Sequence, residues 1–261
     1  MKNIHHKAKK SLGQNFLKSK SALSAIVDAG DISADDIILE IGPGKGALTK
    51  ELLGSSGQVL AVEKDRELVE LLEEKFKKEI EDKKLILIKG DILEFQPNTY
   101  NLETRTYKVI ANIPYNITGA ILKKFLSAET KPERMVLLVQ KEVADRIVAR
   151  DGKESILSLS VKAYGDVKKI IKVPKTSFSP APKVDSAVIA IENISMKNFN
   201  GANGVSEERF FELVRSGFAH KRKVLAKNLE NSGLPAETLK NLGKKRAEDL
   251  ALGDWLDMAK R

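Results

Sequence analysis

Cysteine is absent from the 261 residues, and this absence excludes several kinds of chemistry at once. A chain without thiols forms no disulfide, holds no metal through thiolates and uses no cysteine nucleophile. Such a composition is typical of a reducing compartment, so we expect a cytoplasmic protein. The only three histidines, His5, His6 and His220, are too scattered in the chain to predict a metal cluster. We therefore expect no metal site.

Long apolar runs are missing as well. Runs such as MVLLV at 135–139 have about a quarter of the roughly 20 residues that a membrane-spanning helix needs. The N-terminus, MKNIHHKAKK, lacks the apolar segment of a signal peptide. We expect a soluble protein with no membrane partner. At 42% hydrophobic residues, the chain can still build one large domain, or one large and one small domain.

Acidic residues are absent from residues 1–20, which contain six lysines of a chain with net charge +9. Further basic clusters lie at 220–223 (HKRK) and at 244–246 (KKR). Clustered positive charge suits a polyanion such as a nucleic acid, but it is also typical of a hydrated, solubilising surface. Charge alone therefore favours a nucleic-acid partner only slightly.

Strand-length apolar runs alternate with amphipathic helical patterns over the first three quarters of the chain. The runs lie at 36–42, 57–63, 84–91, 107–112, 134–140, 167–173 and 184–192. This alternation predicts a mostly parallel sheet with helices on both faces. Asp65 is expected to cap the helix that follows the second run.

The texture of the sequence changes near residue 195, where Gly, Asn and Ser become frequent, and only helical patterns follow. We therefore expect an α/β domain with a basic N-terminal arm at 1–194, a linker at 195–205 and a small helical domain at 206–261.

Polar or glycine-rich elements follow the first four apolar runs. They are EIGPGKG at 40–46, Glu63, Asp91 and Asn112. In an open parallel sheet, ligands bind beyond the carboxyl ends of the strands, so this row outlines a small-molecule site. A carboxylate such as Glu63 is able to accept both hydrogens of a ribose diol, and Asp91 those of an exocyclic amine. The row suits a nucleoside-bearing cofactor such as S-adenosylmethionine.

The glycine loop contains Gly42, Gly44 and Gly46, and glycines there permit a tight turn and a close approach to a ligand. Its third glycine comes one residue earlier than in the dinucleotide fingerprint G-x-G-x-x-G, which disfavours a nicotinamide oxidoreductase. A loop of this kind is also typical of an ordinary turn between a strand and a helix.

The stretch NIPY at 112–115 is suited to orienting an amine. The exocyclic nitrogen of adenine is a poor nucleophile because its lone pair is delocalised into the ring. The side-chain oxygen of Asn112 and the carbonyl of Ile113 are able to accept its two hydrogens, Pro114 fixes the backbone, and Tyr115 offers a stacking face. Alternatively, Asn112 caps a turn and Tyr115 is a core residue. The upstream glycine loop and acids favour the first interpretation.

Motifs in a fixed order along nearly the whole chain resemble the ribosomal RNA adenine N6,N6-dimethyltransferase family, most closely its bacterial small-subunit (16S rRNA, KsgA-type) enzymes. The motifs are KKSLGQNFL (9–17), LEIGPGKGALT (39–49), VEKD (62–65), GDIL (90–93), ANIPYNIT (111–118), VQKEVADRIVA (139–149), FSPAPKVDSAV (178–188) and RAEDL (246–250). The resemblance implies a class I S-adenosylmethionine-dependent methyltransferase fold, Rossmann-like with a seven-stranded sheet, and a small helical RNA-binding domain.

Roles for particular residues follow from the resemblance. It implies cofactor contacts from Asn15, Leu17, Gly42, Gly44, Glu63, Asp91 and Asn112. The target adenine is expected against Asn112, Ile113, Pro114 and Tyr115, with Phe178 stacking on its other face. The RNA contacts are expected from Lys9, Lys10, Lys221, Arg222 and Lys223. From the residues alone, Phe178 is a core aromatic, and Asn15 has no assigned role.

The implied reaction is the transfer of methyl groups to N6 of two adjacent adenosines near the 3′ end of 16S rRNA. The expected partner is this RNA within an immature small subunit, and the protein is expected to be a monomer. In two places the sequence departs from related enzymes. Ile113 stands where many amino-methyltransferases have proline. Lys221 stands where relatives often have arginine, which removes a bidentate phosphate contact.

Two alternatives stay open at this level. The first is the antibiotic-resistance branch, which modifies adenine in 23S rRNA and shares the catalytic motifs. The C-terminal segments HKRK and RAEDL favour the small-subunit branch. The second is a nucleic-acid-binding protein on the same fold without activity. The intact set of Glu63, Asp91, Asn112 and Tyr115 argues against that alternative.

Overall fold

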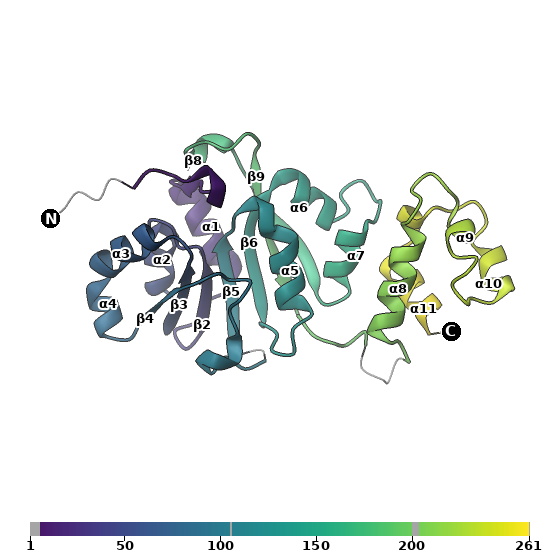
Figure 1. Ribbon diagram of the computed structural model, residues 1–261, viewed down its shortest axis with the longest axis horizontal. Coiled ribbons are helices and arrows are strands. Elements are labelled where there is room, and N and C mark those ends of the chain that lie inside the picture. Colours follow the sequence, from purple (N-terminus) through teal and green to yellow (C-terminus); the bar gives the residue numbers. More distant parts are fainter. Residues whose placement is uncertain (1–5, 105, 200–203, 261) are drawn as a thin grey trace. The chain divides into compact units, whose positions relative to one another are not determined.

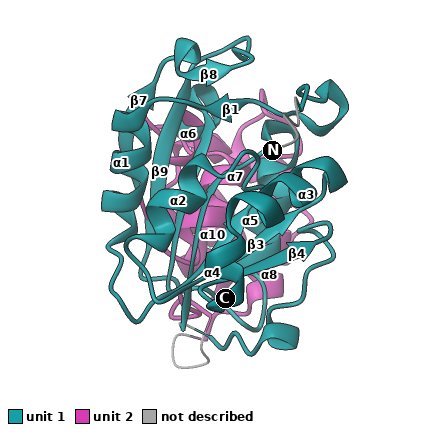
Figure 2. Ribbon diagram, turned by 90° about the vertical axis from the view of Figure 1, so that its left-hand side faces the viewer, with its two compact units in different colours: residues 1–144, 168–194 teal, residues 145–167, 195–261 magenta. Residues whose placement is uncertain are grey.

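The computed structural model describes residues 6–104, 106–199 and 204–260, which pack into two compact units. The first unit comprises residues 1–144 and 168–194, and the second comprises 145–167 and 195–261 (Figure 2). Residues 145–167 thus pack with the C-terminal helices, although they come from the middle of the chain. The start of the basic arm and residues 200–203 of the predicted linker lie outside the described residues. The predicted domain boundaries stay a prediction.

The first unit is built on the seven-stranded, mostly parallel sheet that the apolar runs predict, with the order β4-β3-β2-β5-β6-β9-β7 (Figure 1). Its strands are β2 (Ile37–Ile41), β3 (Gln58–Glu63), β4 (Leu85–Lys89), β5 (Tyr107–Asn112), β6 (Arg134–Gln140), β7 (Asp166–Val173) and β9 (Ser186–Glu192). Strands β2 to β6 pair in parallel, and β9 pairs antiparallel with β6. The central strands are buried on both faces, which explains their nearly continuous apolar runs.

Helices cover both faces of this sheet, since α5 lies in front of it and α1 behind it in Figure 1. The helices in this part of the chain are α1 (Lys20–Gly30), α2 (Ala47–Leu53), α3 (Arg66–Lys75), α4 (Lys77–Glu81), α5 (Thr118–Leu126) and α6 (Lys141–Ile147). The expected cap of α3 is confirmed: the Asp65 carboxylate accepts a hydrogen bond from the backbone amide of Glu67. Short 3-10 helices occur at Lys10–Leu12, Pro97–Tyr100, Tyr115–Ile117, Lys175–Ser177 and Ala247–Asp249.

A separate two-stranded sheet holds the N-terminal segment on the first unit. Strand β1 (Phe16–Leu17) pairs antiparallel with β8 (Phe178–Ser179), with Phe16 opposite Ser179 and Leu17 opposite Phe178. The backbone amide of Lys18 also donates to the carbonyl of Ser177 at 2.8 Å. The residues before β1 are therefore tethered close to the main sheet.

The second unit is helical, with α7 (Ile156–Lys162), α8 (Glu207–Gly217), α9 (Leu225–Asn228), α10 (Ala236–Asn241) and α11 (Leu252–Ala259). Trp255 and Phe210 are fully buried in it. The amide of Ser195 donates to the carbonyl of Tyr164 at 2.9 Å, and the Asn198 side chain donates to the carbonyl of Ala163. Residues 195–199 thus pack within this unit. No helix among the described residues has both the length and the hydropathy that a bilayer crossing requires.

Candidate active site

A cavity of about 630 Å³ lies at the carboxyl ends of strands β2 to β5. Ten of the residues predicted to form the site line it: Asn15, Leu17, Gly42, Gly44, Glu63, Asp91, Asn112, Ile113, Pro114 and Tyr115. The parallel register brings these residues to one edge of the sheet, and the N-terminal segment supplies a further wall with residues 11–18. The size of the cavity is in the range of small-molecule sites.

The three glycines of the loop after β2 do not all serve the same purpose. All three have positive φ, with +63° at Gly42, +59° at Gly44 and +72° at Gly46, a conformation that other residues rarely adopt. An added Cβ at Gly42 meets no atom within 4 Å, so the backbone there faces open space. At Gly46 an added Cβ lies 2.4 Å from the Phe76 ring. Gly42 therefore permits close approach of a ligand, whereas Gly46 permits packing on α3.

Glu63, the last residue of β3, is held by two backbone amides. Gly44 donates to its Oε2 at 3.1 Å, and Asp65 donates to its Oε1 at 2.8 Å. Glu63 is only 6% exposed, and this burial raises the pKa of its carboxyl. Each carboxylate oxygen has a second lone pair, so the group is still able to accept hydrogen bonds from a diol.

Asp91 follows β4 and is bound by a lysine. Its Oδ2 lies 2.8 Å from the Nζ of Lys64, and its Oδ1 accepts from the amide of Leu93 at 2.9 Å. The hydrogen bond from Lys64 is the main reason why the pKa of Asp91 lies below its usual value. Asp91 is therefore a carboxylate at neutral pH and is able to accept from an exocyclic amine.

The Asn112 side chain is oriented by the N-terminal segment. Its amide nitrogen donates to the backbone carbonyl of Asn15 at 3.2 Å, which leaves the side-chain oxygen as the group that a substrate amine can use. The next residue, Ile113, is buried at 2% exposure, and Pro114 and Tyr115 are half-buried. The side chain of Asn112 is a wall of the cavity rather than a turn cap on its own motif.

Tyr115 begins a short 3-10 helix, and its hydroxyl lies 2.6 Å from the Oγ of Ser186, a fully buried residue of β9. Burial raises the pKa of the Tyr115 phenol. The ring is thus fixed at its hydroxyl end.

Phe178 is not among the cavity-lining residues. Its side chain is 3% exposed and belongs to the hydrophobic core, and its backbone pairs with Leu17. This position agrees with the interpretation of Phe178 as a core aromatic from the residues alone. Its stacking role, which only the family resemblance implies, stays a prediction.

The predicted RNA contacts lie in two regions. Lys221, Arg222 and Lys223 are exposed in the second unit, and Lys10 is exposed on the arm. Lys9 differs, because its Nζ lies 2.7 Å from the Asp65 carboxylate and 3.0 Å from that of Glu67. The contribution of Lys9 to RNA binding stays a prediction, and so do those of the other four residues.

Two acidic residues of this region had no role in the site assigned from the sequence, although Asp65 was expected to cap α3. Glu40 of β2 lines the cavity, is 1% exposed, and has an Oε2 atom without a hydrogen-bond partner among the described residues. Burial raises the pKa of Glu40 to about 8. Its position within an apolar strand was the available signal, because an acid there is rarely buried without a reason.

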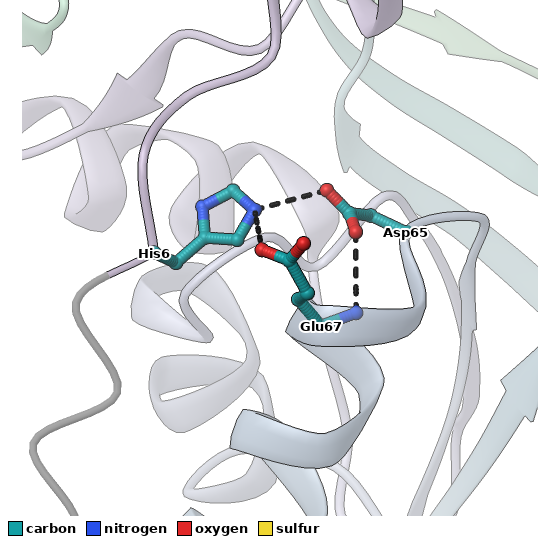
Figure 3. Close-up of side chains that lie close together, drawn as sticks. All are labelled: His6, Asp65 and Glu67. Carbon is teal, nitrogen blue, oxygen red and sulfur yellow. Dashed lines mark hydrogen bonds and ion pairs between the residues drawn. The ribbon is translucent and has the colours of Figure 1, made fainter.

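The second is Asp65, which lies beside His6 and Glu67 (Figure 3). Ligand atoms of these three side chains lie within 4.8 Å of one another, an arrangement that could hold a metal ion. The Lys9 ammonium, however, contacts both carboxylates and already supplies positive charge there. The absence of a metal requirement stays a prediction.

Comparisons with known proteins extend over nearly the whole chain. The sequence profile of a family described as Ribosomal RNA adenine dimethylase matches residues 5–261. A protein named Ribosomal RNA small subunit methyltransferase A, from Dehalococcoides mccartyi (strain CBDB1), is 42% identical over 257 residues, covering 95% of this chain and 86% of that protein. Its namesake from Thermosynechococcus vestitus is 38% identical and covers 97% of this chain and 96% of its own length.

Solved structures of related enzymes are similar to this chain over nearly its whole length. A dimethyladenosine transferase from Plasmodium falciparum has a TM-score of 0.77 and 27% identity, covering 93% of this chain and 95% of that chain. The 23S rRNA methyltransferase ErmE has a TM-score of 0.78 and 25% identity, covering 95% of this chain and all (100%) of its own. The similarity therefore includes residues of both units and not the sheet alone.

Proposed function

Because the chain belongs to the ribosomal RNA adenine dimethylase family, we propose that it transfers methyl groups from S-adenosylmethionine to N6 of two adjacent adenosines near the 3′ end of 16S rRNA. The protein is an rRNA adenine dimethyltransferase of the class I methyltransferase fold. The observation that carries the proposal is the convergence of Gly42, Glu63, Asp91 and Asn112 on one cavity.

The cavity fits a nucleoside-bearing methyl donor. Glu63 is positioned to accept hydrogen bonds from a ribose diol, and Asp91 from an adenine amine. Both side chains are carboxyl groups that backbone amides hold at the strand ends. The open space at Gly42 accommodates a ligand close to the backbone. S-adenosylmethionine supplies an electrophilic methyl group on a sulfonium centre. Asn15 and Leu17 close the cavity from the N-terminal side.

The target adenine is oriented by the NIPY motif. The Asn112 side-chain oxygen and the Ile113 carbonyl accept the two hydrogens of the exocyclic amine and draw its nitrogen toward tetrahedral geometry, which frees the lone pair for attack. Pro114 limits the backbone freedom of this pair of acceptors. Tyr115 stacks on the extruded base, with its ring fixed through Ser186.

No side chain has to remove a proton before attack. The amine nitrogen becomes acidic once it gains a bond and positive charge, and water or a backbone carbonyl then receives the proton. The second methylation has one N–H left to orient, so a single acceptor positions the amine while a methyl group occupies the place of the other hydrogen. Phe178 reaches the base in this proposal only if its ring leaves the core.

The small subunit is the proposed substrate, in an immature form recognised by the exposed basic residues of the second unit. Relatives named for the small subunit are 42% and 38% identical, compared with 25% for the 23S rRNA enzyme. This difference favours 16S over 23S rRNA. We also propose that the protein is cytoplasmic and monomeric.

The test is the identity of the product. Small subunits that lack the modification are incubated with the protein and S-adenosylmethionine, and the RNA is digested to nucleosides for mass spectrometry. We expect N6,N6-dimethyladenosine in 16S rRNA. Products confined to monomethyladenosine under excess donor, or methyl groups on cytidine or guanosine, would contradict the proposal. Labelling of 23S rRNA instead would favour the antibiotic-resistance branch.

A further inference from the structure

The Asp65 carboxylate binds the N-terminal segment through three side chains. Its Oδ2 lies 2.9 Å from the Nε2 of His6 and accepts from the Nε2 of Gln14 at 2.8 Å, and its Oδ1 accepts from the Nζ of Lys9 at 2.7 Å. The side chains of His6 and Asp65 are 0% and 1% exposed, so the contact between them (Figure 3) is buried, whereas the contacts from Lys9 and Gln14 are partly buried. Burial acts to raise the pKa of Asp65, but the hydrogen bonds from Lys9, Gln14 and His6 outweigh it and hold that pKa well below its usual range.

The segment that Asp65 binds forms a wall of the cavity proposed for the methyl donor. Residues 11–18 line the cavity, and the segment is internally braced, because the Lys9 amide donates to the Gln14 Oε1 at 2.8 Å. Its far end is tied to β8, and its middle contacts the Asn112 side chain through the carbonyl of Asn15. Without the Asp65 contacts, the described start of this wall would still be held by the ion pair of Lys9 with Glu67 at 3.0 Å and by a 3.4 Å hydrogen bond from the Lys45 Nζ to the His6 carbonyl.

The same residue also fixes the floor of the cavity. The Asp65 backbone amide donates to Glu63 Oε1 at 2.8 Å, opposite the bond from Gly44 to Oε2. One residue thus joins the wall formed by the N-terminal segment to the carboxylate proposed to hold the ribose.

We propose that Asp65 is a positioning residue for the methyl donor: its carboxylate holds residues 6–14 against the cavity while its backbone amide orients Glu63. This inference rests on the proposed use of the cavity for S-adenosylmethionine. Asp65 itself does not line the cavity and acts through the residues it holds.

A substitution can separate this role from the helix cap. Asp65 also caps α3, but serine is an equally good cap with a side chain too short to bind three partners from the arm. Asp65→Ser therefore keeps the helix cap and removes the three contacts between the carboxylate and the N-terminal segment. Lys9→Met is a second variant, made on the arm, where the side chain is 37% exposed and a folding defect is not expected.

A matched control exists at the other end of the sheet. Asp36 forms an ion pair of the same length, 2.7 Å, with the buried Lys108, and neither residue lines the cavity. Asp36→Ser removes an equivalent lysine-aspartate pair from the same unit. It is expected to affect stability without affecting the donor.

Two measurements test the inference. The first is the Kd of S-adenosylmethionine by calorimetry, together with its KM and kcat on small subunits. For Asp65→Ser we expect Kd and KM to rise at least about tenfold, with kcat at saturating donor less affected, and Lys9→Met to shift in the same direction. The second is amide hydrogen exchange without donor. The amides of Leu12 and Gly13 should exchange at least about tenfold faster, whereas Lys18, bonded to Ser177, should be unchanged.

The outcomes are separable. Weaker donor binding and faster exchange in Asp65→Ser, with both normal in Asp36→Ser, support the inference. Unchanged Kd and unchanged exchange in folded Asp65→Ser overturn it, and so does equal weakening in Asp36→Ser. If Asp65→Ser does not fold, Lys9→Met decides by the same two measurements. If the wild-type protein does not bind S-adenosylmethionine, the proposed function of the cavity fails. Unchanged exchange in Asp65→Ser would then also show that the Asp65 carboxylate does not hold the N-terminal segment in place.

Discussion

The hydroxyl of Tyr115 and the Oγ of Ser186 lie 2.6 Å apart, and this contact joins the motif after β5 to the antiparallel strand β9. The two residues are 71 positions apart in the chain. Ser186 is fully buried, so no solvent molecule is available to replace the Tyr115 hydroxyl as its hydrogen-bond partner. A ring that is fixed at its hydroxyl end offers a stacking face in one orientation only.

Removing this bond should slow methylation without affecting the donor. We expect Tyr115→Phe and Ser186→Ala each to lower kcat by roughly three- to tenfold, which corresponds to one hydrogen bond of about 0.5–1.5 kcal/mol. Tyr115→Ala, which also removes the ring, should be more severe, because stacking is worth about 1–3 kcal/mol per base. Turnover on small subunits and calorimetry with the donor are the two measurements.

Tyr107→Phe is the control for this pair. Tyr107 is a buried tyrosine at the opposite end of β5, and its hydroxyl donates to the carbonyl of Thr130 at 3.1 Å. Its loss should change stability and leave turnover unchanged. If Tyr115→Phe behaves like Tyr107→Phe, the Ser186 contact is structural only.

Glu63→Ala should weaken the binding of S-adenosylmethionine by roughly ten- to a hundredfold, because a hydrogen bond to a charged group contributes about 1.5–3 kcal/mol. Glu63→Gln should not restore it. The new amide would place a donor where the backbone amides of Gly44 and Asp65 already donate. Calorimetry on the folded variants measures the effect, and an unchanged Kd in both would place the ribose elsewhere.

Exchanging Lys221, Arg222 and Lys223 for glutamine should weaken RNA binding and flatten its salt dependence. Each phosphate that the protein no longer neutralises should reduce the log-log slope by about 0.7–0.9, since fewer counterions are released. Donor affinity should stay constant. The control replaces three exposed lysines of the first unit, Lys77, Lys78 and Lys84, and changes the net charge equally. Equal slopes in the two triple variants would show that only net charge matters.

The sheet and the row of site residues could be predicted because each has a local signal. Strands buried on both faces leave continuous apolar runs, and β5 and β6 were located to the residue in this way. The polar residues at the strand ends followed from the parallel order of the sheet. The end of each apolar run is visible in the sequence, and this is enough to locate Glu63, Asp91 and Asn112.

Other features depend on where distant segments meet, and a local pattern does not contain that information. Strands β1 and β8 have two residues each, too few for any periodicity. His6 and Asp65 are 59 positions apart, and their contact requires the arm to fold back on α3. Phe178 illustrates the reverse. Its core position agrees with its apolar character, whereas its stacking role came from family resemblance alone.

The pH dependence of stability should depend on Glu40. Burial raises the pKa of this carboxyl from an ordinary value of 4.5 to about 8, so the folded protein retains a proton that the unfolded chain has lost. Below pH 4.5 both states are protonated and no stability is lost. Between pH 4.5 and about 8, the unfolded state becomes ionised while the folded state does not. The unfolded state then binds fewer protons, so stability falls as pH rises, by at most about 1.4 kcal/mol per pH unit.

Glu40→Gln should remove this dependence, because the amide stays neutral and has nearly the same shape. Melting temperatures of the two proteins from pH 5 to 9 measure it, and we expect the variant to gain on the wild type with each pH unit up to about 8. Asp36→Asn is the control with the opposite sign. The pKa of Asp36 is lowered, because hydrogen bonds from Lys108 and Ser33 outweigh its burial, so its contribution is lost only at acidic pH and is constant over this range. Parallel curves for Glu40→Gln and wild type would mean that Glu40 is already ionised in the folded protein, with the Oε2 atom reached by solvent from the cavity.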